Sequence, residues 1–543
     1  MGGICCPTMS SDLHNAVAQR RTFAIISHPD AGKTTLTEKL LLYGGAIQLA
    51  GSVKARRNQR RATSDWMDME KERGISITST VLQFDYQGFV INLLDTPGHD
   101  DFSADTYRTL TAADSAVMLI DNAKGVETQT KKLFAVCTQR GLPIFTFVNK
   151  MDQPGKGPLA LLTEIEDVLG IRSVPLNWPI GEGVDFKGVY DRETKLVHLF
   201  SKTAHGATKA GLDVVPVDDP KLPELVGQAL YDRLISDIEL IEIAGEAMNI
   251  EEVLAGRLTP VFFGSAVSNF GVEMFLRQFL AIAPPPVGRE STDGKVDPET
   301  PFSGFVFKIQ ANMDPNHRDR IAFMRVVSGK FEKDMEVTHA RMKKTVRLTR
   351  PQRLFAQDRE TVEEAYPGDI VGLTNPGLFM LGDTVSLKGG VQYNEVPSFL
   401  PEAFGYLRNM DIGKLKQFEK GVEQLCQEGL VDVYWDPSAG RREPIIGVVG
   451  RLQFDVLQHR LMAEYSVKTT LDPLPFEVLR WLDGAPEEID KIYFSDRMRK
   501  LEDQRGRPVV VIANEWSLNY AMEQYPNVKF LDKSPDGNPA RRG

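Results

Sequence analysis

Short, continuous apolar runs alternate with helical patterns through residues 13–283. The apolar runs predict strands at residues 22–27, 89–95, 116–121, 144–149 and 261–264. Segments with helical spacing of apolar residues lie between them, at residues 33–43, 128–140 and 159–169. Strands that are buried on both faces of a sheet give such unbroken apolar runs. The pattern therefore predicts an α/β domain with a mostly parallel sheet and helices on both of its faces.

The pattern changes after residue 283. Residues 284–301 are rich in proline and polar residues, which is typical of a linker. Short β-rich pieces separated by turn residues follow at 302–390 and predict an antiparallel β-barrel. Residues 391–531 mix strands and helices and predict an α+β domain. We expect flexible tails at residues 1–12 and 532–543.

Composition narrows the possible environment and partners. The 543 residues carry a net charge of −10, which argues against a strongly basic DNA-binding protein. Local basic clusters still occur at residues 54–63 and 343–353, where contact with RNA and a simple solvated face are both open readings. The four cysteines form no CxxC pair, and no apolar run is long enough to span a membrane. We expect a cytoplasmic monomer that has no zinc site and does not contact membranes.

A phosphate-binding loop is predicted between the first strand and the first helix. Residues 27–34 match the GxxxxGK[ST] pattern at three of its four fixed positions, with Ser27 at the first. In this strand–loop–helix context, Lys33 is expected to reach the β- and γ-phosphates and the Thr34 hydroxyl to bind Mg²⁺. A chance Gly-Lys-Thr in an ordinary loop is the alternative. The expected nucleotide-binding residues are Ser27, His28, Pro29, Asp30, Ala31, Gly32, Lys33, Thr34 and Thr35.

A second candidate motif follows the strand at residues 89–95. Asp95 can hold Mg²⁺ through a water molecule, and the Gly98 peptide N–H can contact a γ-phosphate. His99 alone would be read as a surface histidine, but its position after Asp-Thr-Pro-Gly favours orientation of the attacking water. We therefore add Asp95, Thr96, Pro97, Gly98 and His99 to the nucleotide site, with His99 and Lys33 as its catalytic residues.

The segment Asn149-Lys150-Met151-Asp152 indicates guanine rather than adenine. The Asp152 carboxylate can accept hydrogen bonds from guanine N1–H and the 2-amino group, whereas adenine has no matching donors. Asn149 can position the base, and the Lys150 stem can cover its face. The backbone of Ser265 and Ala266, after the last strand, could contact guanine O6. GTP and GDP are therefore the expected substrate and product, and a generic ATPase is disfavoured.

Residues 65–76 (DWMDMEKERGIS) resemble the effector signature of the ribosome-dependent translational GTPases, the relatives of elongation factors Tu and G. That resemblance implies that the Ser76 hydroxyl binds Mg²⁺ in the GTP state. Further segments look like the class II release factors of this family, at residues 27–35, 64–67, 307–315, 317–320, 363–369, 447–450 and 452–455.

The resemblance to class II release factors implies a function in translation termination. Such a protein hydrolyses GTP on the ribosome and drives class I release factors off after peptide release. Two alternatives remain at this point. One is another translational GTPase similar to elongation factor G, although the chain is too short for the tip domains of that factor. The other is a nucleotide-gated ribosomal scaffold without useful hydrolysis, which the presence of Lys33 and His99 disfavours.

Overall fold

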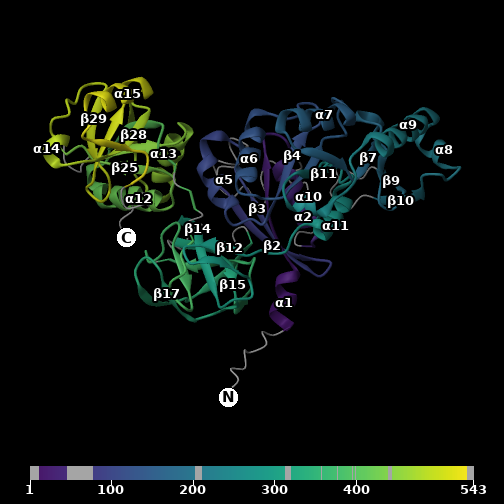
Figure 1. Ribbon diagram of the computed structural model, residues 1–543, viewed down its shortest axis with the longest axis horizontal. Helices are drawn as coiled ribbons and strands as arrows, with labels where there is room; N and C mark the ends of the chain where they lie inside the picture. The colour runs from purple at the N-terminus through teal and green to yellow at the C-terminus, as the bar shows by residue number, and fades with distance from the viewer. Residues whose placement is uncertain are drawn as a thin grey trace, which may run out of the picture.

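A computed structural model describes residues 11–45, 78–201, 211–311, 320–355, 358–375, 377–393, 396–397, 399–437 and 443–534. The chain forms an α/β domain, a β domain and a C-terminal α+β domain. They follow one another along the chain, from purple to yellow in Figure 1. The short helix α1 (Ser11–Ala18) precedes the first strand. In the part of the chain described here, no helix is long and apolar enough to cross a membrane.

The first domain is built on a seven-stranded sheet with the order β2-β3-β1-β4-β5-β11-β6. Only the β2–β3 pair is antiparallel, so the predicted mostly parallel sheet is confirmed. The strands are β1 (Arg20–Ser27), β2 (Thr80–Tyr86), β3 (Phe89–Asp95), β4 (Ser115–Asp121), β5 (Ile144–Asn149), β6 (Arg172–Pro175) and β11 (Leu258–Phe263).

Helices cover both faces of this sheet, as predicted. One apolar core includes Leu133 and Leu161, from α6 and α7, and the other includes Leu40 and Phe275, from α2 and α11. Burial of apolar side chains on both faces is what makes these strands continuous apolar runs. The helices are α2 (Lys33–Tyr43), α5 (Ser103–Leu110), α6 (Thr128–Gln139), α7 (Pro158–Leu169), α10 (Ile250–Leu254) and α11 (Val272–Ile282), with a 3-10 turn η1 (Asp100–Phe102) before α5.

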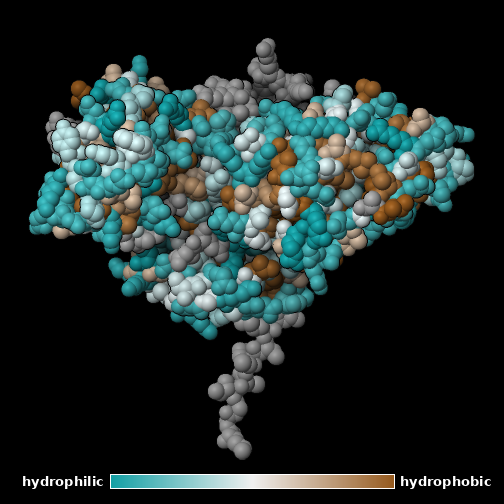
Figure 2. All heavy atoms as spheres, turned by 45° about the horizontal axis from the view of Figure 1, so that its top comes forward, coloured by the Kyte–Doolittle hydropathy of each residue, from teal (hydrophilic) through white to brown (hydrophobic). Residues whose placement is uncertain are grey.

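An insertion that the sequence pattern did not predict extends the first domain at one end (Figure 1). It is a four-stranded antiparallel sheet of β7 (Asn177–Ile180), β8 (Gly188–Asp191), β9 (Leu196–Ser201) and β10 (Gly211–Pro216), followed by α8 (Leu222–Val226) and α9 (Gln228–Ala244). Trp178 donates to Asp237 Oδ2 at 3.0 Å and so ties the sheet to α9. Several brown patches in Figure 2 lie over this part, where Val214, Leu225, Leu240 and Ile243 are exposed.

The second domain is antiparallel, as predicted. Its eight-stranded sheet has the order β18-β17-β23-β14-β15-β22-β19-β20, and a small β16–β21 pair accompanies it. A hairpin of β12 (Arg289–Ser291) and β13 (Gly294–Val296) lies within residues 284–301. The strands are β14 (Ser303–Ala311), β15 (Arg320–Ser328), β16 (Phe331–Glu332), β17 (Glu336–His339), β18 (Lys344–Arg347), β19 (Pro351–Phe355), β20 (Asp358–Thr361), β21 (Glu364–Ala365), β22 (Ile370–Thr374) and β23 (Thr384–Ser386).

The C-terminal domain has the predicted α+β character. Two four-stranded sheets, β25-β26-β24-β27 and β29-β30-β28-β31, carry its helices. The strands are β24 (Ala403–Asn409), β25 (Asp432–Tyr434), β26 (Ile445–Val448), β27 (Thr469–Leu474), β28 (Val478–Asp483), β29 (Met498–Glu502), β30 (Pro508–Ile512) and β31 (Lys529–Leu531). The helices are α12 (Leu415–Gln427), α13 (Leu452–Tyr465), α14 (Pro486–Ile489) and α15 (Glu515–Gln524).

Buried ion pairs join the first two domains. Asp114 lies just before β4 and accepts from Arg325 of β15 at 2.6 Å, with side-chain exposures of 0% and 1%. Arg289 adds a second contact to Asp114, and Arg20 pairs with Asp369 at 2.8 Å. Burial lowers the pKa of Arg325, and the charge of Asp114 opposes that shift. The Asp114 carboxylate therefore offsets part of the cost of burying the Arg325 charge in the interface.

Replacing Asp114 by alanine should destabilise this joint strongly, because it leaves the buried Arg325 without its carboxylate. Loss of one partner of a buried pair costs about 3–5 kcal/mol. Replacing Glu242 by alanine removes an exposed pair with Lys195 and should cost at most about 1 kcal/mol. Urea unfolding of the two variants compares these costs, and equal destabilisation would contradict the role given to Asp114.

Candidate functional site

The phosphate-binding loop connects β1 to α2, the strand–loop–helix arrangement predicted from the sequence. β1 ends at Ser27, and α2 begins at Lys33. Gly32 precedes the helix with a φ of 98°, a left-handed conformation that glycine adopts without strain. The first backbone N–H groups of a helix have no partner within the helix, so they can bind an anion here.

The end of β3 brings Asp95 to this loop. Ile25 and Asp95 are paired in the parallel register of β1 and β3, and the Thr96 hydroxyl donates to Ile25 O at 2.7 Å. The Lys33 ammonium lies 2.5 Å from Asp95 Oδ1, and both side chains are buried. The first two motifs therefore meet through a buried charge pair.

Gly98 and His99 form one wall of the same pocket. A Cβ at Gly98 would lie 3.4 Å from the backbone nitrogen of Pro29, so the residue packs directly on the phosphate loop. The His99 side chain is 39% exposed, and its Nδ1 accepts from Asp101 N at 3.3 Å. That contact leaves Nε2 available to a water molecule in the pocket.

Asn149 links the phosphate loop to the loop after β11. Its Nδ2 donates to Ala31 O at 2.9 Å, and its Oδ1 accepts from Ala266 N at 2.8 Å. A Cβ on Gly32 would lie only 2.3 Å from Asn149 Nδ2, so glycine is needed there for close approach as well as for its backbone angle. The Asn149 side chain thereby connects the phosphate-binding loop to the loop after β11.

The two charged residues that follow Asn149 differ in their contacts: Lys150 is ion-paired, whereas one oxygen of Asp152 has no partner among the described residues. Lys150 has a φ of 66°, and its ammonium lies 2.8 Å from Asp121 Oδ2. Burial by itself raises the pKa of Asp121, but hydrogen bonds from Lys150 and from the Ala123 N–H hold that pKa below its ordinary value. The Lys150 ammonium is thus held against Asp121. Asp152 Oδ1 is buried and has no hydrogen-bond partner among the described residues. A buried acceptor of this kind fits an incoming donor.

A pocket of about 290 Å³ collects the three motifs. It is lined by Ser27, His28, Pro29, Asp30, Gly32, Lys33, Thr34, Thr35, Gly98, His99, Asn149 and Lys150 from the prediction, and also by Gln153 and Val267. The other predicted residues are outside this lining, namely Ala31, Asp95, Thr96, Pro97, Met151, Asp152, Ser265 and Ala266. Sequence reasoning missed Gln153 and Val267, although each directly follows a predicted residue.

Two oxygen donors for a divalent cation lie at the phosphate end. The Thr34 hydroxyl lines the pocket, and the Asp95 carboxylate is held behind it by Lys33. Hydroxyl and carboxylate oxygens are the hard ligands that Mg²⁺ prefers, so this donor set fits the ion. Ser76, the third predicted ligand, lies outside the described residues, as does the basic segment at residues 54–63.

Three family models match successive parts of the chain. Residues 18–285 match the elongation factor Tu GTP binding domain, residues 301–388 match elongation factor G domain 2, and residues 393–522 match the class II release factor RF3, C-terminal domain. A crystal structure of a Thermus thermophilus protein shares the fold, with a TM-score of 0.68 at 23% identity over 86% of this chain and 71% of that one. The fold and the first two matches define a translational GTPase.

Relatives over nearly the full length then specify which translational GTPase this is. Proteins named peptide chain release factor 3 from Gloeothece citriformis and Microcystis aeruginosa are each 57% identical to it, over 97% and 96% of this chain and 98% and 96% of their own. One from Symbiobacterium thermophilum is 56% identical over 95% of this chain and 98% of its own. The chain belongs to the peptide chain release factor 3 family. It is a GTP hydrolase of translation termination, and the elongation factor G-like alternative is disfavoured.

Proposed function

We propose that the pocket between β1, β3, β5 and β11 binds GTP and positions it for hydrolysis. The observation that carries this proposal is the convergence of three separate sequence motifs on one cavity, with Asn149 bonded to two of its loops. In this arrangement Lys33 and the loop N–H groups hold the phosphates. The unpaired Asp152 oxygen accepts from guanine. The N–H groups of Ser265 and Ala266, which the sequence assigned to guanine O6, are instead bonded to Phe270 O and Asn149 Oδ1.

At the phosphate end of the proposed site, Thr34, Ser76 and, through water, Asp95 would hold Mg²⁺. Bound there, the ion would neutralise charge on the phosphate oxygens. The Lys33 ammonium then moves from Asp95 toward the β- and γ-phosphates, because those oxygens carry more negative charge than one carboxylate. Because His99 Nδ1 accepts from Asp101 N, the proton of the neutral ring is on Nε2, and this N–H donates to the oxygen of the attacking water and orients it. The place of His99 in the pocket lining and the hydrogen bond that occupies its Nδ1 support this role.

We further propose that the ribosome stimulates hydrolysis. The His99 ring is partly exposed and contacts Asp101 N and the Phe102 ring, so an external surface can reach it and complete its orientation. Lys343, Lys344, Arg347 and Arg350 are exposed around β18 and are candidate contacts to ribosomal RNA. The other such cluster is at residues 54–63.

The test of this proposal is GTP turnover by the purified chain with and without ribosomes. We expect slow turnover alone and at least about 10³-fold acceleration by ribosomes, the scale that completing a phosphoryl-transfer site provides. Removal of Mg²⁺ by chelation should abolish the accelerated rate. Ribosome-independent turnover at the stimulated rate would contradict the proposal.

The cellular role follows from the names of the relatives. We propose that the GTP-bound chain acts on the ribosome in the cytoplasm as a monomer and stimulates dissociation of class I release factors after peptide release. The relatives named peptide chain release factor 3 and the match of residues 393–522 to the class II release factor C-terminal domain support this role.

A further inference from the structure

The segment after His99 is held by the C-terminal domain. η1 and α5 continue the chain from His99. In Figure 1, α5 lies on the side of the first domain that faces the C-terminal domain, and η1 contacts α13. Asp101 Oδ2 accepts from Leu452 N at 2.7 Å, across 351 positions of sequence. At the other end of this segment, Arg108 donates to Gly429 O at 3.1 Å.

Two glycines of the C-terminal domain make this approach possible. A Cβ on Gly450 would lie 2.4 Å from Asp101 Cα, and a Cβ on Gly429 would lie 2.3 Å from Arg108 Nη1. Both distances are shorter than real Cβ contacts. Any larger residue at Gly450 must therefore push the backbone of Asp101 away, because a Cα atom cannot move aside as a flexible side chain can.

An apolar contact and a helix end reinforce the Asp101 contact. Phe102 is 3% exposed and packs with Val456 of α13, beside Leu430 and Leu452. Leu452 is the first residue of α13, so its N–H has no partner within the helix. The helix dipole also favours a carboxylate at that position. The Asp101 carboxylate thus accepts a hydrogen bond from the Leu452 N–H, which no group within α13 could accept.

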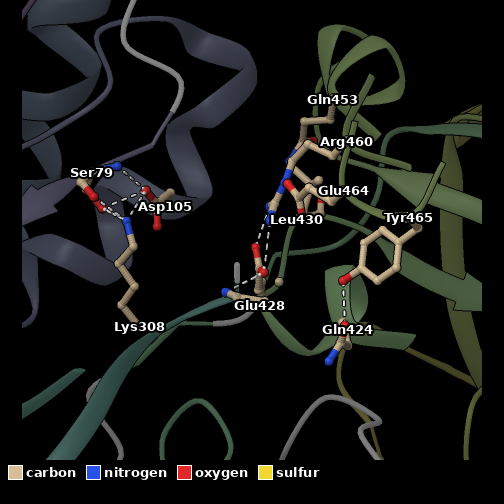
Figure 3. A network of polar contacts seen from close by, with 12 residues as sticks. Ser79, Asp105, Lys308, Gln424, Glu428, Leu430, Gln453, Arg460, Glu464 and Tyr465 are labelled. Carbon is tan, nitrogen blue, oxygen red and sulfur yellow. Dashed lines mark hydrogen bonds and ion pairs between the residues drawn. The ribbon is translucent and has the colours of Figure 1, made fainter. Parts of the chain in front are cut away.

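The β domain reaches the same segment from another side. The Lys308 ammonium donates to Ser79 Oγ at 2.9 Å and lies 3.5 Å from Asp105 Oδ2 in α5, as Figure 3 shows. Burial alone raises the pKa of Asp105, but Lys308 and the hydrogen bonds from Ser79 outweigh burial and lower it. In the same view, Glu428 of the C-terminal domain accepts from Ala311 N at 2.7 Å. The three domains therefore meet around α5.

We propose that Asp101 is a positioning residue for GTP hydrolysis, through which the C-terminal domain sets the orientation of His99. Two contacts carry the inference. The Asp101 side chain is bonded to Leu452 N of α13, and its backbone N–H is bonded to His99 Nδ1. A displacement of the C-terminal domain at Gly450–Leu452 is transmitted to the imidazole over two residues. This inference rests on the proposed role of His99 in orienting water.

The test compares Asp101→Ala with Asp100→Ala. Asp100 is the adjacent acid, it is half exposed, and it pairs with Lys132 of the same domain, so it is a matched control. We expect Asp101→Ala to lower the ribosome-stimulated kcat about tenfold or more while Asp100→Ala stays within about twofold. The KM for GTP and the Kd for GDP should be unchanged in both. Asp101→Asn should restore most of kcat, because its amide oxygen still accepts from Leu452 N.

Two further results separate this inference from its premise. Gly450→Ala should reproduce the kcat loss of Asp101→Ala, since it acts on the same contact from the other domain. A wild-type kcat in both Asp101→Ala and Gly450→Ala would overturn the role of Asp101. A loss of kcat that Asp101→Asn does not rescue, together with weaker GDP binding, would also overturn it. If His99→Ala itself keeps the full rate, the premise fails instead.

Discussion

Replacing His99 by alanine should lower ribosome-stimulated GTP hydrolysis by about 10²–10⁴-fold, the range that a group handling the attacking water contributes. His99 lines the phosphate end of the pocket, and its Nδ1 is already occupied by Asp101 N. Nε2 is therefore the atom that meets water, and alanine supplies no replacement. Single-turnover hydrolysis on ribosomes measures the loss.

The control for this experiment is GTP affinity together with a His99→Gln variant. Because His99 lies outside the Lys33–Asp95 pair and the Asn149 contacts, GTP binding should be unchanged within about twofold. Glutamine can also orient a water molecule and should retain part of the rate. Full ribosome-stimulated hydrolysis by His99→Ala would remove this residue from the mechanism.

Replacing Asp152 by asparagine should weaken GTP binding by about 10⁴-fold or more, because sites built to hydrogen-bond a substrate reject a mismatched partner by about 10⁴–10⁵. The buried Oδ1 of Asp152 accepts no hydrogen bond from the described residues, so its proposed partner is guanine. An amide presents one acceptor and one donor where guanine offers two donors. Equilibrium titration with a fluorescent GTP analogue measures the change.

The Asp152→Asn variant can also be tested for a gain of binding, with a purine that has a carbonyl at position 2. The asparagine N–H₂ can donate to that carbonyl, so Asp152→Asn should bind xanthosine triphosphate more tightly than the unchanged chain does. Asp167→Asn, at an exposed position of α7, is the control and should bind GTP normally. Unaltered GTP affinity in Asp152→Asn would show that this carboxylate does not contact the base.

The sheet of the first domain was predictable because burial on two faces leaves a strong local signal. The helix at Lys33–Tyr43 begins and ends where its pattern predicts. The β7–β10 insertion was not predicted. Strands such as β8, Gly188–Asp191, are four residues long and carry no continuous apolar run. Their stability comes from neighbours in the sheet and from the Trp178–Asp237 contact, which no local window contains.

The residues of the site were also predictable only where the signal is local in the sequence. The phosphate loop, Asp95 and Asn149 were predictable because each follows directly on a buried strand, where chain topology places polar residues at one edge of a parallel sheet. The double contact of Asn149 with Ala31 and Ala266 depends on residues more than a hundred positions away. The Asp101–Leu452 contact likewise joins two domains. Tertiary packing creates such contacts, and sequence spacing does not record them.

We propose that the GTP-bound chain removes a class I release factor from the ribosome. The most direct measurement uses post-termination ribosomes that carry a fluorescently labelled class I factor. Addition of the chain with GTP should accelerate loss of the label, whereas the chain with GDP should not. Dissociation of the class I factor at the same rate with and without the GTP-bound chain would contradict the claim.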